Sequence, residues 1–542
     1  MKNRVFYLLF LLLLPLGTLL AQSTGGSSNY FVYGILAIAV ILFLGLIVQV
    51  SDNLLAIEAK RVGADKTGTN FSIFPRLNEL LAPKAPAYTE GHTVIRTQRG
   101  FDIKLEGEAI KTIDSSVQAN TFALQPRNFH GMSPIPKVEV EPRQQVKAGD
   151  VLFYDKRYPE IKYVAPVSGE IVAVNRAEKR AIKEVVILAD KNMQYREVPA
   201  FNLDGSSREE LVNFLAEYGA WPLLTQRPFD VVPGLKDVPR DIFISTFDSA
   251  PLAPDLNFVV EGRGNHFQKG LDVLSKLTPG RIYLGLDARG EKAPSTVFTK
   301  AEGVEQYWFN GKHPVGNVGI QIHHINPIRP QDKVWVLNVQ DVITLGALFT
   351  ERRFNAERVV VLTGAELKQP VYVRTYLGAN IGELVKNNLK NDHVRLISGD
   401  VLSGKTKSEA DFLNFHDDQI TVIEEGDDYV LFGWLTPRLV PSVSPALPSF
   451  LFPNIQFKAN TNTNGEERAF VVTGQYEAVL PMDIYPQHLF KAILANDFEK
   501  MEGLGIHELS EEDVALCEFV CTSKQPLQEI LREGLDAVHA ES

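Results

Sequence analysis

Two short stretches decide the fold of the first soluble domain: Val146-Lys-Ala-Gly-Asp-Val-Leu-Phe153 and Ala165-Pro-Val-Ser-Gly-Glu-Ile-Val172. The first joins a Gly-Asp turn to an apolar strand, and the second joins a proline turn and a glycine to another strand. Gly149 and Gly169 can adopt the positive φ that such tight turns require. We therefore predict that the two stretches form the two halves of a barrel-sandwich of short strands.

This pattern is typical of lipoyl- and biotin-type domains, which carry a modified lysine in a hairpin between Met or Ala neighbours. The corresponding hairpin here is Asp155-Lys-Arg-Tyr-Pro159, which does not fit a modified lysine. We therefore expect a structural barrel over residues 98–205 and no carrier function.

Residues 206–350 alternate between helical and strand-like patterns. The helical segments are 208–220 and 267–277, and the strand-like runs are 241–246 and 281–286. Such alternation predicts a parallel sheet covered by helices, as in a Rossmann-like α/β domain.

Residues 351–402 have a different order of elements. Two strand-like runs, Arg358–Gly364 and Val371–Val373, precede a helical segment from Ile381 to Asn388. We expect a small β-grasp (SLBB-like) module there, followed by a mixed β/loop region over 403–485.

The last part of the chain, 486–542, is predicted to be helical. Ser510 and Asp513 have the spacing of a capping box. Pro526 then opens a helix with an apolar stripe, which we interpret as a core or docking surface. The stripe consists of Leu527, Ile530, Leu531, Leu535 and Val538.

The N-terminus has the composition of a membrane segment. Residues 1–21 join two positive charges to an apolar run, which fits a signal peptide or a first transmembrane helix. Residues 30–50 contain no charge and are long enough to cross a bilayer as a helix. Lys60 and Arg61 follow this span, so the positive-inside rule places the rest of the chain in the cytoplasm. Residues 51–97, rich in proline, are expected to form a tether.

Composition excludes several classes of protein. The 542 residues carry a net charge of −11, which argues against a nucleic-acid partner. Two cysteines are too few for a disulfide scaffold, or for a four-thiolate zinc or iron–sulfur site from this chain alone. Overall we expect a multidomain α/β and β protein with an N-terminal transmembrane anchor.

One motif matches a phosphate-binding loop letter for letter: Gly399-Asp-Val-Leu-Ser-Gly-Lys-Thr406. A functional loop needs a stable helix after Thr406, whose amides would hold phosphate. Residues 407–416 offer few apolar contacts for such a helix. We therefore do not expect nucleotide hydrolysis.

Other motifs are weaker. Gly262-Arg-Gly264 begins a dinucleotide fingerprint, but Phe267 occupies the third glycine position, so we interpret it as a turn. His323 and His324 are adjacent, so in a strand they point to opposite faces and cannot easily share a metal. Cys517 and Cys521 share a helix face and are interpreted as a buried pair. No catalytic, cofactor-binding or metal residue is therefore nominated, and no quinone-contacting residue is assigned.

Segments spread over about residues 98–540 resemble the A subunit of the sodium-translocating NADH:quinone oxidoreductases, and their order and spacing are specific to that family. They are Arg99–Ile103, Ala165–Gly169, Gly270–Ser275, His313–Gly316, Tyr372–Thr375, Ile397–Gly404, Leu431–Trp434, Thr461–Gly465 and Glu511–Cys517.

The resemblance implies one component of a six-subunit complex in the bacterial inner membrane that oxidises NADH, reduces ubiquinone and pumps sodium ions outward. It implies a cytoplasmic body that interacts with quinone and docks on the membrane-embedded B subunit. FAD, FMN, riboflavin and the iron centres would then be carried by other subunits, and none by this chain.

The chain departs from the family pattern in two places. Members of the family begin near Gly100 without a membrane span, so the first 90 residues form an extension. Where the family tends to show two histidines two positions apart, this chain has Gln321 and His323. Two alternatives stay open: a membrane-anchored adaptor with a lipoyl-like barrel, and a component of a related Rnf-type electron-transport complex.

Overall fold

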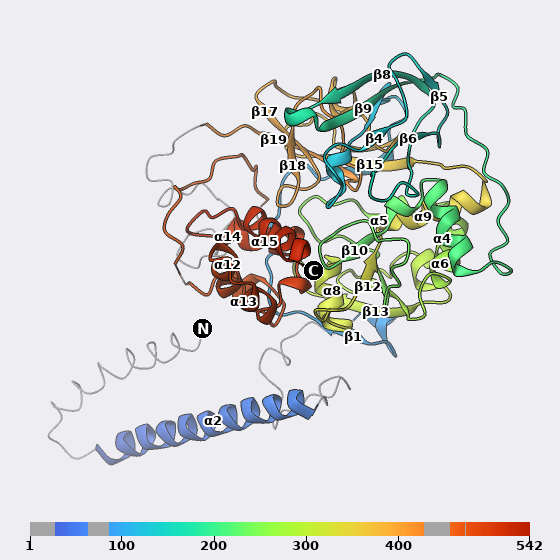
Figure 1. The fold of residues 1–542 in the computed structure, drawn as a ribbon. Helices are drawn as coiled ribbons and strands as arrows, with labels where there is room; N and C mark the ends of the chain where they lie inside the picture. Colours follow the sequence, from blue (N-terminus) through green and yellow to red (C-terminus); the bar gives the residue numbers. More distant parts are fainter. Residues whose placement is uncertain (1–27, 63–85, 428–455, 472, 542) are drawn as a thin grey trace. The chain divides into compact units, whose positions relative to one another are not determined.

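The computed structural model describes residues 28–62, 86–427, 456–471 and 473–541. The chain divides into two compact units, Met1–Lys84 and Ala85–Ser542 (Figure 1). The segment predicted over residues 1–21 lies outside the described residues, as does 428–455 within the expected β/loop region.

The first unit is described by one helix, α2 (Ser28–Val62). Its window Gly34–Asp52 is long and apolar enough to cross a membrane. This window overlaps the predicted span over 30–50. The helix continues to Val62, so the first part of the predicted tether is helical.

A six-stranded sheet forms the α/β part of the second unit, in the order β1-β13-β12-β11-β14-β10. All neighbours are parallel except β10 and β14. From β11 the chain builds β12 and β13 on one side and then returns to place β14 on the other. The strands are β1 (Val94–Arg96), β10 (Thr225–Arg227), β11 (Ile242–Ser245), β12 (Ile282–Asp287), β13 (Glu305–Asn310) and β14 (Val334–Val336).

Helices cover this sheet, as the alternating pattern predicted. They are α4 (Arg208–Glu217), α5 (Leu256–Val259), α6 (Gly264–Ser275), α7 (Thr296–Thr299), α8 (Val318–Ile325) and α9 (Val339–Thr350). Helices α6 and α9 approach closely because two glycines leave space between their backbones. A Cβ on Gly270 would lie 2.2 Å from the carbonyl oxygen of Val342, and one on Gly346 would lie 1.8 Å from that of His266.

A second six-stranded sheet has the order β18-β17-β19-β15-β16-β2. Its strands are β2 (Ile110–Ile113), β15 (Glu357–Thr363), β16 (Val371–Tyr376), β17 (Val394–Ser398), β18 (Lys405–Lys407) and β19 (Gln419–Glu424), with helix α10 (Ile381–Val385). It contains the two strands and the helix expected for the β-grasp module. Strand β2 joins it from a segment of the chain that precedes the barrel strands.

The barrel-sandwich consists of two small sheets, β3-β9-β8-β5 and β4-β6-β7. Its strands are β3 (Thr121–Leu124), β4 (Lys137–Val138), β5 (Gln145–Val146), β6 (Val151–Tyr154), β7 (Tyr163–Val164), β8 (Gly169–Arg176) and β9 (Ile182–Ala189). The two deciding stretches form β5–β6 and the start of β8. Gly169 is required because a Cβ there would lie 1.9 Å from the carbonyl oxygen of Leu188.

The C-terminal part is helical: α11 (Tyr476–Val479), α12 (Pro486–Leu494), α13 (Phe498–Gly503), α14 (Glu511–Val520) and α15 (Leu527–Glu541). The backbone N–H of Ser510 donates to Asp513 Oδ2 at 3.0 Å, as the predicted cap requires. All five residues of the predicted apolar stripe on α15 are buried in the core of this part. Short 3-10 helices are η2 (Ala87–Thr89), η3 (Pro126–Asn128), η4 (Glu178–Arg180), η5 (Trp221–Leu223) and η7 (Ile506–Glu508).

Candidate functional site

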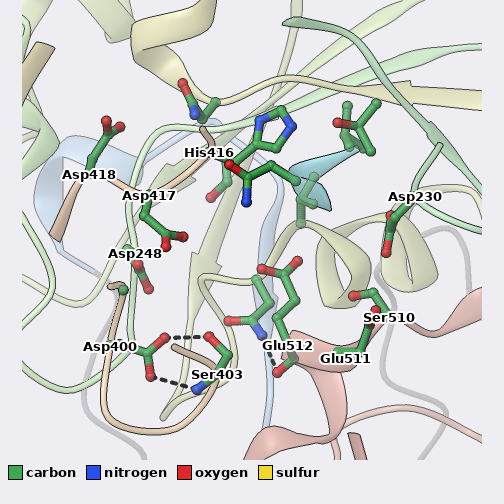
Figure 2. Close-up of a pocket in the computed structure, with 18 of the residues that line it drawn as sticks. Asp230, Asp248, Asp400, Ser403, His416, Asp417, Asp418, Ser510, Glu511 and Glu512 are labelled. Carbon is green, nitrogen blue, oxygen red and sulfur yellow. Dashed lines mark hydrogen bonds between the residues drawn. The ribbon is translucent and has the colours of Figure 1, made fainter. Parts of the chain in front are cut away.

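A cavity of about 850 Å³ lies at the carboxyl ends of β11 and β14, where the strand order of the α/β sheet reverses. Ser245, Phe247 and Asp248 line it after β11, and Leu337 and Asn338 line it after β14. Open α/β sheets bind their ligands at this switch point. The cavity is therefore the best candidate for a binding site (Figure 2).

Four parts of the second unit build the wall. Besides the α/β domain, the barrel contributes Asn128–His130, the second sheet contributes Gly399–Lys405 and His416–Gln419, and the C-terminal helices contribute the starts of α14 and α15. The cavity exists only when all four parts are packed together.

The lining is strongly acidic. It contains three Lys or Arg residues and eleven Asp or Glu residues. The acidic residues are Asp230, Asp248, Asp341, Asp400, Asp417, Asp418, Glu511, Glu512, Glu529, Glu533 and Asp536. Such a surface attracts cations and repels phosphate groups, so the cavity is a poor site for a nucleotide.

Several of these carboxyl groups hold protons more tightly than usual. Loss of hydration in the crowded cavity wall raises the pKa of Asp248 to about 6, and the nearby charge of Asp400 adds to this. Burial also raises the pKa of Asp418 to about 6, although Arg358 opposes the shift. Loss of hydration in the cavity wall also raises the pKa of Glu512, whose side chain is 41% exposed, to about 8, against the effect of Arg227. These groups can therefore take up and release protons near neutral pH.

Arg227 joins the α/β domain to the C-terminal helices at one side of the cavity. Its Nη2 donates to Glu512 Oε1 at 2.9 Å and its Nη1 to Asp513 Oδ2 at 3.4 Å. Its Nε lies 2.6 Å from Asp230 Oδ1. The arginine is buried, so it neutralises carboxylates that would otherwise repel one another.

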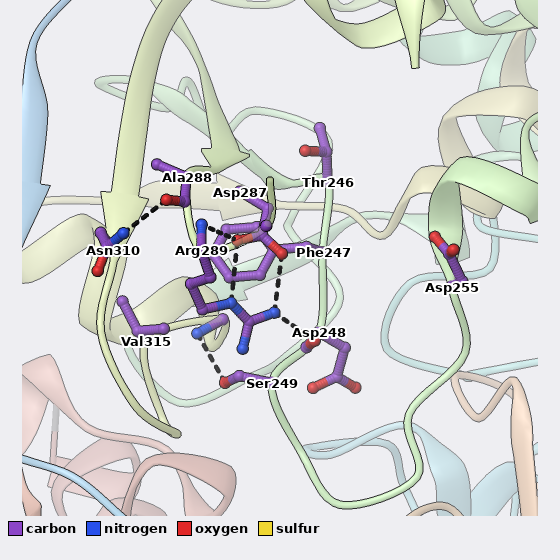
Figure 3. A network of polar contacts seen from close by, with 12 residues as sticks. Thr246, Phe247, Asp248, Ser249, Asp255, Asp287, Ala288, Arg289, Asn310 and Val315 are labelled. Atoms are coloured by element: carbon purple, nitrogen blue, oxygen red, sulfur yellow. Dashed lines mark hydrogen bonds and ion pairs between the residues drawn. The ribbon is translucent and has the colours of Figure 1, made fainter. Parts of the chain in front are cut away.

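A second polar network fixes the loops that follow β11 and β12 (Figure 3). Arg289 binds the carboxylate of Asp287 through two hydrogen bonds of 2.9 Å. Its guanidinium carbon lies 4.8 Å from the centre of the Phe247 ring, and its Nη2 donates to the carbonyl oxygen of Asp248 at 3.4 Å. This network holds Phe247 and Asp248 in the cavity wall.

The phosphate-loop letters do not form a phosphate-binding loop. Residues 399–404 connect β17 to β18, and Lys405 begins a strand instead of preceding a helix. The backbone N–H groups of Leu402 and Ser403 donate to Asp400 Oδ1 at 2.6 and 3.2 Å (Figure 2 shows the bonds from Ser403). Because a carboxylate already occupies these amides, they are not free to bind phosphate.

The other motifs have structural roles. Gly262, with φ +76°, forms the predicted turn, and Gly264 begins α6. The strand considered for His323 and His324 is not formed, because both lie in helix α8. His323 Nδ1 lies 2.7 Å from Glu508 Oε2 and His324 Nε2 lies 2.8 Å from the carbonyl oxygen of Pro481, so both contact the C-terminal part.

Cys517 and Cys521 are free and buried, as predicted. The hydroxyl oxygen of Tyr476 lies 2.8 Å from Cys521 Sγ. Burial raises the pKa of the Cys517 thiol well above its usual range. The two cysteines therefore behave as packing residues.

Sequence reasoning did not identify the cavity, although four residues of the motif Gly399–Thr406 line it: Gly399, Asp400, Ser403 and Lys405. The adjacent pairs Asp417-Asp418 and Glu511-Glu512 are a further local signal, but each is typical of a solvated or capping pair when taken alone.

The fold and this site define a multidomain, mixed α/β protein with an acidic cavity at the junction of its domains. Three family models match its parts: the NqrA N-terminal barrel-sandwich hybrid domain over 95–190, the NqrA second alpha/beta domain over 206–354, and the NQRA C-terminal domain over 359–409.

Curated relatives extend this similarity over most of the chain. The A subunit of the Na(+)-translocating NADH-quinone reductase from Saccharophagus degradans is 38% identical, covering 83% of this chain and 100% of the relative. Those of Neisseria meningitidis serogroup B and Haemophilus influenzae are 36% and 37% identical, with the same coverage. The chain belongs to the family formed by the A subunits of Na(+)-translocating NADH-quinone reductases.

Among solved structures, a chain of an NAD+-reducing [NiFe]-hydrogenase in the air-oxidized state is 12% identical. The match covers 62% of this chain and 64% of that chain, with a TM-score of 0.33. This similarity is too low to carry an argument.

Proposed function

We propose that this chain serves as the A subunit of a membrane complex that oxidises NADH, reduces ubiquinone and moves sodium ions outward. The observation that carries the proposal is the match to relatives of that name over their full length. The chain is then part of a translocase and is inactive alone.

Within the complex, we propose that the chain interacts with quinone and carries no redox cofactor, with FAD, FMN, riboflavin and the iron centres on other subunits. In support, the described residues contain no group of three His, Cys, Asp or Glu side chains placed to hold a metal. The acidic cavity is also unsuited to the phosphate of a flavin nucleotide.

We further propose that α2 anchors the chain in the bacterial inner membrane, with its body on the cytoplasmic side and docked on the membrane-embedded B subunit. The apolar window Gly34–Asp52 supports a span, and Lys60 and Arg61 after it support the orientation. The anchor precedes residue 95, where the family models begin.

The test is affinity purification of the tagged chain in mild detergent, followed by mass spectrometry. Co-purification of flavin-bearing membrane subunits in a fixed ratio is expected. Recovery of the chain alone, or with an outer-membrane channel, would contradict the proposal and favour an adaptor.

The orientation needs a separate measurement. A reporter that is active only in the cytoplasm, fused at the C-terminus, should be active. A reporter that requires export, fused at the same position, is the matched control and should be inactive. The reverse pattern would contradict the cytoplasmic assignment.

A further inference from the structure

The hairpin between β8 and β9 ends in a cluster of cations, which we call the cationic tip. It consists of Arg127, Arg176, Lys179 and Arg180. The N–H of Ala177 donates to the carbonyl oxygen of Ala181 at 2.8 Å, which closes the turn that carries Lys179 and Arg180, and Arg176 ends β8 just before it. Arg127 lies in η3, which contacts β9.

These cations are exposed at the surface, although Arg176 Nη1 already donates one hydrogen bond, of 3.2 Å, to the carbonyl oxygen of Arg180. All four are exposed, and none takes part in an ion pair with another described residue, in contrast to Lys183, which pairs with Asp411. Glu178 is the one carboxylate in the turn. The positive charge of these four side chains is therefore not neutralised by an ion pair with another described residue, on a chain whose net charge is −11.

The backbone at the tip is strained in a way that favours other residues. Lys179 and Arg180 have φ values of +53° and +63°. Two successive positive φ angles in a hairpin turn are normally met by Asn-Gly or Asp-Gly. Lys179 and Arg180 therefore hold the turn in a backbone conformation that costs some stability.

An aliphatic side chain accompanies the cations. The N–H of Ile182 donates to the carbonyl oxygen of Pro134 at 3.0 Å, which places the next residue, Ile135, beside the tip. Ile135 is 39% exposed. Cations near an exposed aliphatic residue fit the headgroup region of an anionic bilayer.

We propose that the cationic tip binds the anionic phospholipid headgroups of the membrane, as a second contact besides helix α2. The inference rests on the proposed anchor, because the same chain then holds both the span and the tip at one bilayer. Each cation near an anionic surface strengthens binding by about fivefold, so the contribution of the tip depends on lipid charge and on salt.

The test uses the full chain with Ala177→Cys, labelled with an environment-sensitive dye. Both native cysteines are buried, so the label attaches at the tip. The labelled chain is floated with vesicles of phosphatidylcholine alone or mixed with phosphatidylglycerol. The dye should move to an apolar environment only with phosphatidylglycerol, and salt should reverse this change.

Lys179→Gln with Arg180→Gln keeps the backbone strain but should weaken the dye response about 25-fold. The matched control, Lys147→Gln with Lys191→Gln, removes two exposed cations and should change nothing. The control cations lie beyond the opposite end of β9: Lys191 follows the strand, and the N–H of Ala148 bonds to Gln194.

An equal response with both lipids, or an unchanged response after the Gln substitutions, would overturn the proposal. A response that appears only when other subunits co-purify would also overturn it and assign the tip to an acidic protein surface. If the chain fails to float with neutral vesicles, the proposed anchor is refuted but the role of the tip is still open to test. In that case, flotation with anionic vesicles would be compared between the unchanged tip and the variant with Lys179→Gln and Arg180→Gln.

Discussion

Arg358 should be among the most costly side chains to remove from this protein. It lies on β15, and its guanidinium binds Asp341 of α9, which joins the second sheet to the α/β domain. Nη1 also donates to Thr344 Oγ1 at 3.3 Å. The side chains of Arg358 and Asp341 are 1% and 2% exposed, so neither charge is solvated.

Arg358→Leu would leave the carboxylate of Asp341 buried without its partner. Breaking a buried pair in this way costs about 3–5 kcal/mol. With an m-value of about 2 kcal/mol/M in urea, the unfolding midpoint should fall by about 1.5–2.5 M. The double variant Arg358→Leu/Asp341→Leu should recover most of this loss, because it removes both charges.

Three buried tryptophans, Trp221, Trp308 and Trp335, lie in the α/β domain, so tryptophan fluorescence of the full chain in mild detergent reports this transition. The matched control is Arg281→Ala, which breaks an exposed pair with Glu305 and should cost less than about 1 kcal/mol. A midpoint for Arg358→Leu equal to that of the control, or a double variant as unstable as the single one, would refute the reasoning.

Three further outcomes are expected. Gly270→Ala should lower the free energy of unfolding, measured by the same transition, by about 1–3 kcal/mol because the new Cβ meets Val342 of α9. By contrast, a Cβ on Gly503 would have no atom within 4 Å, so Gly503→Ala should stabilise the protein by up to about 1 kcal/mol in thermal unfolding. The folded-state pKa of Glu512 is raised from 4.5 to about 8, so its ionisation opposes folding. The free energy of unfolding should therefore fall as pH rises from 4.5 to about 8, and Glu512→Gln should flatten the profile of unfolding midpoint against pH. The chain should not bind ATP at micromolar concentrations. The amount of ATP bound in equilibrium dialysis should therefore be the same for Lys405→Ala as for the unchanged chain.

The sequence predicted those elements that depend on neighbouring residues. Gly149 and Gly169 marked the turns of the barrel, and the spacing of Leu527 and Leu531 marked the buried face of α15. The periodicity of residues 206–350 indicated an α/β sheet, because a strand or helix that must bury one face shows that face in its pattern.

The same local reasoning did not place His323 and His324. Eight residues, Val318–Ile325, form α8, too short for a clear period, and the contacts with Glu508 and Pro481 come from a part of the chain more than 150 residues away. The phosphate-loop motif is the opposite case, because the local sequence matches completely but the site does not form. The amide of Leu402 donates to Asp400 of the same motif, so it is not free to bind phosphate.

By itself, the sequence determined the kinds of domain, the apolar helix near the N-terminus and the resemblance to a family, because turn chemistry, periodicity and motif spacing are properties of short segments. Only the tertiary structure decided the candidate site. Its acidic wall brings Asp248, Asp418 and Glu512 together from three parts of the chain. The raised pKa values of these groups come from the loss of hydration where those parts meet, which no single segment contains.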